Sequence, residues 1–436
     1  MIKKLILVLL IFSFISNCSF DTKSGIWTNN EKIKKNSLIK NKVQVLFQKD
    51  KAISKEFNEN FLINTPLRKN KKNNSLITNN IGPQVIKDNF NVKSKYNFSK
   101  IKYFENFNPE LVFDKENLIF FDKKGSIIKF NDTSKIIWKK NYYSKKEKKL
   151  LPILNFSLNN DVLIVTDNLA KFYALDLKSG ELLWTKNHTS VVISEIKVDK
   201  DKFYIVDSEN DINCFSLING KKIWTFKTDY DLIKSQKKLS IVYDDSKVYF
   251  NNSKGDIYAL DKTNGNLVWL TPTRTDTESL KSFLIKSSKL VLDQGNLFFS
   301  NNNNTFFSID SNSGFINWIQ NINSEFRPII SENIIFSITS DGYLFLVDKT
   351  NGNIVRITDI FTSFSPKKIK KISISGFVVG LNKIYLSLNN GKILEININD
   401  GKLNNILKIS RSNISSPFIN EGKMFIVKNN GIIKLN

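Results

Sequence analysis

Histidine and cysteine are almost missing from this chain of 436 residues, which has one histidine, His188, and two cysteines, Cys18 and Cys214. A single histidine excludes multi-histidine metal sites and histidine relays that pass protons. Two cysteines alone exclude zinc ribbons, Cys-X-X-Cys redox sites and disulfide scaffolds. Cys214 stands in an apolar stretch and is expected to be a buried core thiol. His188 has no partner that is evident in the sequence.

Arginine is scarce as well, because only five of the 65 basic residues behind the formal net charge of +24 are arginines. Proteins that read bases and phosphates rely on the planar, two-pronged arginine side chain, which lysine does not reproduce. The charge therefore favours a solvated lysine surface and predicts no nucleic-acid partner. The arginines are Arg68, Arg274, Arg327, Arg356 and Arg411.

Apolar runs of the length that crosses a membrane are absent after residue 18. At the N-terminus Lys3 and Lys4 precede the apolar residues 5–15, as in a secretory signal peptide. Residues 15–18 read Ile-Ser-Asn-Cys and resemble the bacterial lipobox, although Asn17 replaces the preferred Gly, Ala or Ser. We expect residues 1–17 to be a lipoprotein signal peptide and Cys18 to carry the lipid. The alternative is an ordinary signal peptide followed by an incidental cysteine.

Residues 18–84 are rich in lysine and asparagine and hold only short apolar runs. Such a composition predicts a lipid-anchored N-terminal tether rather than a packed domain. The folded part of the chain is expected to comprise residues 85–436.

An internal repeat runs through residues 85–436, in which a glycine is followed four residues later by a tryptophan. The mean spacing of the copies is about 44 residues. Five of the six tryptophans occupy this position, so the pattern is not accidental. Clear copies are Gly180–Trp184, Gly220–Trp224, Gly265–Trp269 and Gly314–Trp318; degenerate copies are Ser134–Trp138, Gly352–Arg356 and Gly401–Asn405.

Each repeat also contains short stretches of alternating apolar and polar residues, which are typical of half-buried strands. An Asp-x-x-x-Gly link, as at 176–180, predicts a tight hairpin before the tryptophan. A second hairpin recurs upstream, so each repeat provides four strands and nothing after about residue 110 needs a helix. The sequence predicts an all-β fold, an eight-bladed β-propeller of four-stranded antiparallel blades.

The eighth repeat lacks its outer strand, because the chain ends at Asn436. An unpaired edge would remain in the ring. We therefore expect an N-terminal strand, within about Val85–Lys100, to close the ring. An open solenoid, or a seven-bladed ring with a loose end, is the alternative. The tryptophans are expected to pack between blades, with a partner for each indole N–H, rather than to form a ligand platform.

The pattern Ala-Leu-Asp-x-x-x-Gly-x-x-x-Trp, at 174–184 and 259–269, resembles the repeat of pyrroloquinoline quinone (PQQ) dehydrogenases. Enzymes and non-enzymes share this repeat. Together with the lipobox and the N-terminally closed eighth blade, residues 85–436 resemble the BamB family of outer-membrane assembly lipoproteins. This resemblance implies a non-catalytic scaffold without a cofactor, lipid-anchored at the periplasmic face of the outer membrane. Its implied partners are the BamA-type barrel-assembly subunit and nascent outer-membrane proteins.

Two other functions stay open on the sequence. A PQQ-dependent dehydrogenase would resemble its class in having vicinal cysteines, a calcium site of Glu, Asn and Asp, and a catalytic Asp. The vicinal cysteines are absent here, and no nucleophile–base constellation is evident. An envelope propeller that binds polysaccharide or another protein is the other alternative.

The resemblance also implies a partner-binding loop after the Trp of the third blade. Here that loop contains the apolar neighbours Leu232 and Ile233 beside Lys234 and Lys237. Gln236 lies near the place of the family's arginine, and neither lysine offers a bidentate fork. Two lysine runs, 145–149 and 367–371, fall in connections between blades. They suit anionic lipid headgroups or an acidic partner, although a solvated lysine surface is the simpler interpretation.

Overall fold

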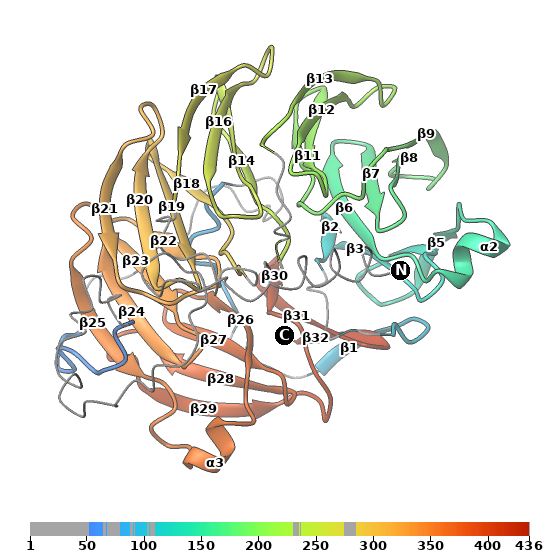
Figure 1. The fold of residues 1–436 in the computed structure, drawn as a ribbon. Coiled ribbons are helices and arrows are strands. Elements are labelled where there is room, and N and C mark those ends of the chain that lie inside the picture. Colours follow the sequence, from blue (N-terminus) through green and yellow to red (C-terminus); the bar gives the residue numbers. More distant parts are fainter. Residues whose placement is uncertain are drawn as a thin grey trace, which may run out of the picture. The chain divides into compact units, whose positions relative to one another are not determined.

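The computed structural model describes residues 52–63, 67, 79–87, 90, 92–102, 104, 110–229, 235, 237–273 and 285–435. These residues form eight antiparallel sheets of four strands arranged in a ring (Figure 1). The predicted all-β, eight-bladed propeller is therefore confirmed. The first strands of neighbouring blades contact one another, so each first strand is the innermost.

The blades follow one another along the chain. Blades 1 to 4 contain β2 (Val112–Asp114), β3 (Asn117–Phe121), β4 (Ile127–Phe130) and β5 (Ile136–Lys140); β6 (Leu154–Asn159), β7 (Val162–Asp167), β8 (Lys171–Asp176) and β9 (Leu182–Asn187); β10 (Lys197–Asp199), β11 (Lys202–Val206), β12 (Ile212–Ser216) and β13 (Lys222–Phe226); and β14 (Ile241–Tyr243), β15 (Lys247–Asn251), β16 (Ile257–Asp261) and β17 (Leu267–Thr271). Blades 5 to 7 contain β18 (Val291–Asp293), β19 (Asn296–Asn301), β20 (Thr305–Asp310) and β21 (Ile316–Gln320); β22 (Ile329–Ser331), β23 (Ile334–Ile338), β24 (Tyr343–Asp348) and β25 (Ile354–Asp359); and β26 (Ile374–Val379), β27 (Lys383–Leu388), β28 (Lys392–Asn397) and β29 (Leu403–Lys408).

The eighth blade closes the ring as predicted. It combines β30 (Phe418–Asn420), β31 (Lys423–Lys428) and β32 (Gly431–Leu435) with the N-terminal strand β1 (Val92–Asn97). The strand β1 pairs antiparallel with β32, so that Tyr96 lies opposite Ile432. Both ends of the folded chain therefore share one blade, and β32 has no unpaired edge.

The turn before each outer strand shows why aspartate and glycine recur there. In blade 2 the Asp176 Oδ1 atom accepts hydrogen bonds from the backbone N–H groups of Lys178, at 3.1 Å, and Ser179, at 2.7 Å. Gly180 then takes a φ of +73°, a conformation that costs glycine little. Aspartate and glycine thus specify the hairpin locally.

Residues 52–63 run along the outer edge of blade 6, although the sequence predicted a tether for all of 18–84. Phe57 and Ile357 of β25 exchange backbone N–H···O=C bonds of 3.0–3.1 Å. Residues 79–87 are also packed, since Asn80 Nδ2 donates to Asp293 Oδ1 at 3.0 Å. Long-range backbone pairing fixes these segments, and composition alone carries no signal of it. The other residues of the predicted tether lie outside the described residues.

Two one-turn helices interrupt the all-β pattern, whereas the sequence required no helix after residue 110. The helix α2 (Lys145–Lys149) joins blades 1 and 2, and α3 (Pro366–Ile369) joins blades 6 and 7 (Figure 1). A capping box explains α2, because the Ser144 hydroxyl and the Glu147 carboxylate each accept the other's backbone N–H. Such a single-turn signal is easily hidden in a lysine-rich connection.

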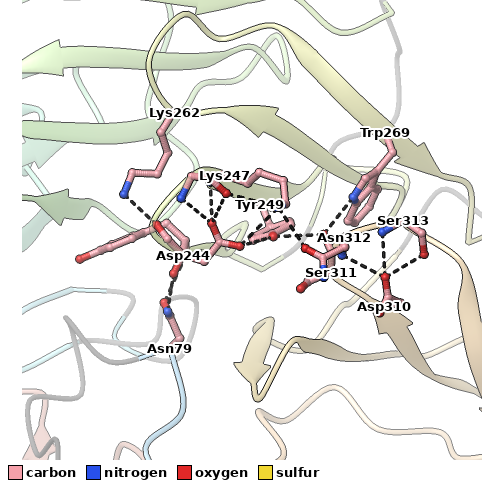
Figure 2. A network of polar contacts seen from close by, with 12 residues as sticks. Asn79, Asp244, Lys247, Tyr249, Lys262, Trp269, Asp310, Ser311, Asn312 and Ser313 are labelled. Carbon is pink, nitrogen blue, oxygen red and sulfur yellow. Dashed lines mark hydrogen bonds and ion pairs between the residues drawn. The ribbon is translucent and has the colours of Figure 1, made fainter.

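The tryptophans of the repeat lock neighbouring blades together, as predicted. Each indole N–H donates a hydrogen bond of 3.0–3.3 Å to a backbone carbonyl of the next blade. The accepting residue comes directly after the Asp of the hairpin, or after the Ser that replaces this Asp in blade 3. In Figure 2 Trp269 donates to the Ser311 carbonyl, which also accepts the Tyr249 hydroxyl. The donor–acceptor pairs are Trp138–Leu177, Trp184–Leu217, Trp224–Lys262, Trp269–Ser311 and Trp318–Lys349.

Two interfaces between blades keep the same lock with donors other than tryptophan. Arg356 replaces tryptophan in β25, and its guanidinium donates to the carbonyls of Ile398, at 3.3 Å, and Asn399. It also donates to the Phe61 carbonyl at 2.9 Å, so it holds residues 52–63 on the blade. At the ring closure the Asp132 carbonyl accepts the Tyr96 hydroxyl and the Lys434 ammonium group.

The glycine of the repeat is required by the tryptophan of the preceding blade. A Cβ atom on Gly314 would lie 2.6 Å from the Trp269 ring, and Gly314 has a φ of +76°. Gly295 has a φ of +79° but no atom within 4 Å of such a Cβ. A substitution at Gly295 therefore tests the positive φ alone, whereas one at Gly314 tests the positive φ together with the contact with Trp269.

Gly314→Ala is expected to destabilise the propeller more than Gly295→Ala. The Gly295 variant should lose about 1 kcal/mol of unfolding free energy, from the positive φ alone. The Gly314 variant should lose about 1–3 kcal/mol more, because the new methyl group displaces the indole. Urea unfolding followed by tryptophan fluorescence measures both. Equal losses would show that the contact with Trp269 is not the constraint.

Candidate functional site at the propeller axis

Charged side chains gather where the innermost strands begin. Glu110 precedes β2, Glu195 precedes β10, Lys289 precedes β18 and Arg327 precedes β22. The Lys289 ammonium group contacts the Glu110 carboxylate and lies 3.2 Å from Glu195 Oε2. The ring thus brings together residues from four blades that span more than 200 positions of the sequence.

Glu195 is the centre of this axial cluster. Its Oε1 atom accepts hydrogen bonds from the Ser240 hydroxyl at 3.0 Å and from the Ile241 backbone N–H at 3.1 Å. The Ser240 hydroxyl oxygen in turn accepts the backbone N–H of Leu290 at 3.0 Å. One buried carboxylate therefore ties the inner strands of blades 3, 4 and 5 together.

The electrostatics of the cluster follow from its burial and its excess of cations. Burial alone would raise the pKa of Glu195, but Lys289, Lys197 and Arg327 outweigh it and lower the pKa to about 2. Burial also lowers the pKa of Lys197 to about 8, against the opposing effect of Glu195. Glu195 is thus ionised at neutral pH, and its charge is compensated inside the protein.

The described axial residues do not fit the quinone and calcium of the dehydrogenases that share this repeat. Calcium requires several carboxylate or carbonyl oxygens that are free to coordinate it. The carboxylates of Glu110 and Glu195 are instead held by Lys289. Among the described residues, no three His, Cys, Asp or Glu side chains are grouped so as to hold a metal ion. The arrangement stabilises the ring and contains no evident nucleophile–base pair.

The sequence-predicted residues are placed as follows. Cys18, Leu232, Ile233 and Lys234 lie outside the residues that the structure describes. Lys237 is described, and its ammonium group donates to the Glu325 carbonyl at 2.8 Å and lies 3.1 Å from the carboxylate of the same residue. Its ammonium group is also 4.9 Å from the centre of the Phe326 ring. Lys237 therefore fastens the end of its loop to the entry of blade 6.

The side chains of Cys214 and His188 are both largely buried. Cys214 is a free, fully buried thiol, as predicted, and burial raises its pKa to about 12. His188 has a partner that the sequence did not indicate, because its Nε2 atom lies 3.8 Å from Asp207 Oδ2. Its Nδ1 atom accepts the Ser190 backbone N–H at 3.1 Å. No nucleophilic side chain is bonded to this pair among the described residues.

Sequence reasoning missed the axial cluster and the packed segment 52–63. The one available signal for the cluster was a charged residue shortly before several innermost strands, as at Glu195 and Lys289. Those strands are only three residues long, so their starts are hard to locate without the structure. No helix in the described part of the chain combines the length and apolar character that crossing a membrane requires.

The fold, the Gly/Trp lock and the repeat define an eight-bladed propeller of the PQQ type. A family model described as outer membrane protein assembly factor BamB matches residues 123–358, which is more than half of the chain. The chain belongs to this BamB family. A search of the curated proteins with the sequence finds no significant match.

Solved structures with the same fold include binding proteins and enzymes. BamB from Moraxella catarrhalis superposes with a TM-score of 0.63 at 13% identity, covering 78% of this chain and 100% of that one. A europium-containing methanol dehydrogenase reaches 0.61 at 11% identity, with 83% and 91% covered. The quinohemoprotein alcohol dehydrogenase from Comamonas testosteroni reaches 0.57 at 10% identity, with 81% and 78% covered. At these identities the likeness shows the fold alone.

Glu195→Gln is expected to destabilise the protein at neutral pH by about 3–5 kcal/mol, because it breaks a buried ion pair and leaves cations uncompensated. The pKa of Glu195 is lower in the folded protein than the usual 4.5, so its stabilisation is present above pH 4.5 and is lost as pH falls toward 2. The difference in unfolding free energy between wild type and variant should therefore become smaller as the pH falls. Urea midpoints between about pH 6 and pH 3 measure it.

Glu209→Gln, at an exposed carboxylate of blade 3, is the control and should change little at any of these pH values. A difference between wild type and Glu195→Gln that stays constant with pH would contradict the assigned ionisation of Glu195.

Proposed function

We propose that this chain is a non-catalytic scaffold of the outer-membrane β-barrel assembly machinery. In this proposal Cys18 carries a lipid that anchors the protein at the periplasmic face of the outer membrane. The propeller binds the BamA-type subunit and aids the insertion of nascent outer-membrane proteins. Family membership over residues 123–358 supports this role.

One observation carries the non-catalytic part of the proposal: the axial carboxylates are already bound. Lys289 lies between Glu110 and Glu195, and Glu195 accepts two further hydrogen bonds. Releasing a carboxylate for a calcium ion would break one of the two ion pairs that Lys289 makes with these buried carboxylates, which is costly. A PQQ-dependent dehydrogenase is the second candidate, favoured by the likeness of the fold to two dehydrogenases. A propeller that binds polysaccharide or another envelope protein is a third.

The partner-binding surface is proposed to be the loop that follows β13. Lys237 is held by Glu325 at the end of this loop. The contacts with the partner are therefore assigned mainly to Leu232, Ile233 and Lys234, with Lys237 as the fixed base of the loop. An apolar pair beside a cation suits a small binding hot spot.

Addition of PQQ with Ca²⁺ is expected to leave the melting temperature unchanged and to produce no dye reduction with alcohols or sugars. A ligand at a hundred times its Kd would stabilise the folded protein by about 2.7 kcal/mol, which thermal unfolding detects readily. A shift of that size would favour the dehydrogenase over the scaffold.

Leu232→Asp/Ile233→Asp should remain folded and lose co-purification with the BamA-type subunit from envelope extracts. Burying two new carboxylates in an interface is strongly unfavourable, so the loss should exceed tenfold. The matched control is Ile218→Asp/Phe315→Asp, at two turn residues that are each 77% exposed. Retained co-purification by the loop variant, or equal loss by the control, would argue against this surface.

A further inference from the structure

The two faces of the ring are distinct because every blade has four antiparallel strands. All connections from an outer strand to the next blade's inner strand therefore emerge on one side, together with the hairpins that join the second and third strands. We call this side the basic face; the other connections form the far face. The two described helices, α2 and α3, are outer-to-inner connections and so belong to the basic face.

The two helices concentrate lysine on the basic face. In α2 and directly after α3 every charged residue except Glu147 is a lysine, and none of these lysines makes an ion pair with a described residue. Leu150, at the end of α2, is 62% exposed. The lysines are Lys145, Lys146, Lys148, Lys149, Lys367, Lys368, Lys370 and Lys371.

Acidic groups near the helices leave this charge largely uncompensated. Glu147 turns back to the Ser144 backbone N–H at 2.6 Å and to Lys171 at 3.3 Å. In the adjacent hairpins Asp122 pairs with Lys139, and Asp167 is fully buried. Asp341 of blade 6 is the exposed acid there. The α2 and α3 lysines therefore present a net positive surface in two separate sectors of one face.

The described segments of the N-terminal chain run from the basic face to the far face. Residues 52–63 begin beside the basic face, where the Ile53 N–H donates to Asn321, and end at the far face, where the Ile63 N–H donates to Asn399. Residues 79–87 then lie on far-face turns, because the Lys87 N–H donates to the Gly422 carbonyl at 2.9 Å. The described chain thus begins beside the basic face.

We propose that the basic face docks on an anionic lipid bilayer, with α2 and α3 as two contact sites and Leu150 inserted at the headgroup level. Lysines near an anionic surface gain electrostatic attraction, and an apolar residue among them adds burial at the interface. The inference goes beyond the scaffold role and does not depend on the partner loop.

Other polyanions fit the observations less well. Every basic residue of the two sites is a lysine, a point charge without the bidentate fork that phosphodiester backbones and acidic protein clefts favour. Two sites spread over one flat face also suit a planar surface better than a single concave partner. An acidic protein partner remains as a distinct outcome of the test.

The test uses the full chain with Cys18→Ala, so that no lipid modification contributes, and two kinds of vesicle. One kind is phosphatidylcholine alone; in the other, one third of the lipid is phosphatidylglycerol. The readout is the ratio of the two partition coefficients in sedimentation. Any contribution of an uncleaved signal segment is the same in every variant, so each variant is compared with the chain that carries Cys18→Ala alone. We expect at least tenfold stronger binding to the anionic vesicles, and loss of that preference at about 0.5 M salt.

Two variants and one control decide the location of the contact. Replacing the four lysines of α2 by glutamine, or the four at α3, should each lower the preference about tenfold, and the eightfold variant should abolish it. The control variant removes four exposed lysines from the far face: Lys135→Gln/Lys178→Gln/Lys221→Gln/Lys402→Gln. It should change the preference for anionic vesicles less than twofold. Melting temperatures should match wild type in all variants.

Three results would overturn the proposal. Equal binding to both kinds of vesicle would show that the face has no attraction for anionic lipid. Equal losses in the helix variants and in the far-face control would show that only net charge matters. Unchanged vesicle binding together with lost co-purification of an acidic envelope protein would assign the face to a protein partner instead.

Discussion

A hydrogen bond between blades is the constraint on which the rest of this propeller depends. In seven of the eight blades, the backbone carbonyl at the hairpin before the outer strand accepts a donor from the preceding blade. Five of these seven carbonyls belong to buried residues, and leaving them unpaired would cost free energy. The blade that lacks this carbonyl is the eighth, where the two strands come from opposite ends of the chain.

The accepting carbonyl is the same in each interface, whereas the donor side chain differs between blades. Five interfaces use tryptophan, whose ring also fills the wedge between blades and forces glycine on the neighbour. Arg356 has more donors than an indole, so it serves the next blade and the Phe61 carbonyl at once. The apparent decay of the repeat at this blade is therefore the place where the N-terminal segment is attached.

The charged groups at the axis stabilise the ring, whereas charged groups on the outer faces can contact other molecules. At the axis the charges of Glu195 and Lys289 satisfy one another, which joins several blades and leaves no free acid for chemistry. On the basic face the lysines of α2 and α3 have no such partners among the described residues. Exposed charge of this kind is what recognition at a surface requires.

Sequence alone determined the blade number, the hairpins and the closing strand. Each depends on contacts that repeat at a fixed spacing. Residues such as Asp176, Gly180 and Trp184 therefore predict their hairpin and their contact with the next blade from the sequence pattern. The tertiary structure decided the axial cluster, the pairing of Phe57 with Ile357 and the placement of the α2 and α3 lysines on the same face. These features join residues from distant repeats or from outside the repeat, and no periodicity records which of them meet. Local hydrogen bonds leave a pattern in the sequence, whereas contacts made only by ring closure do not.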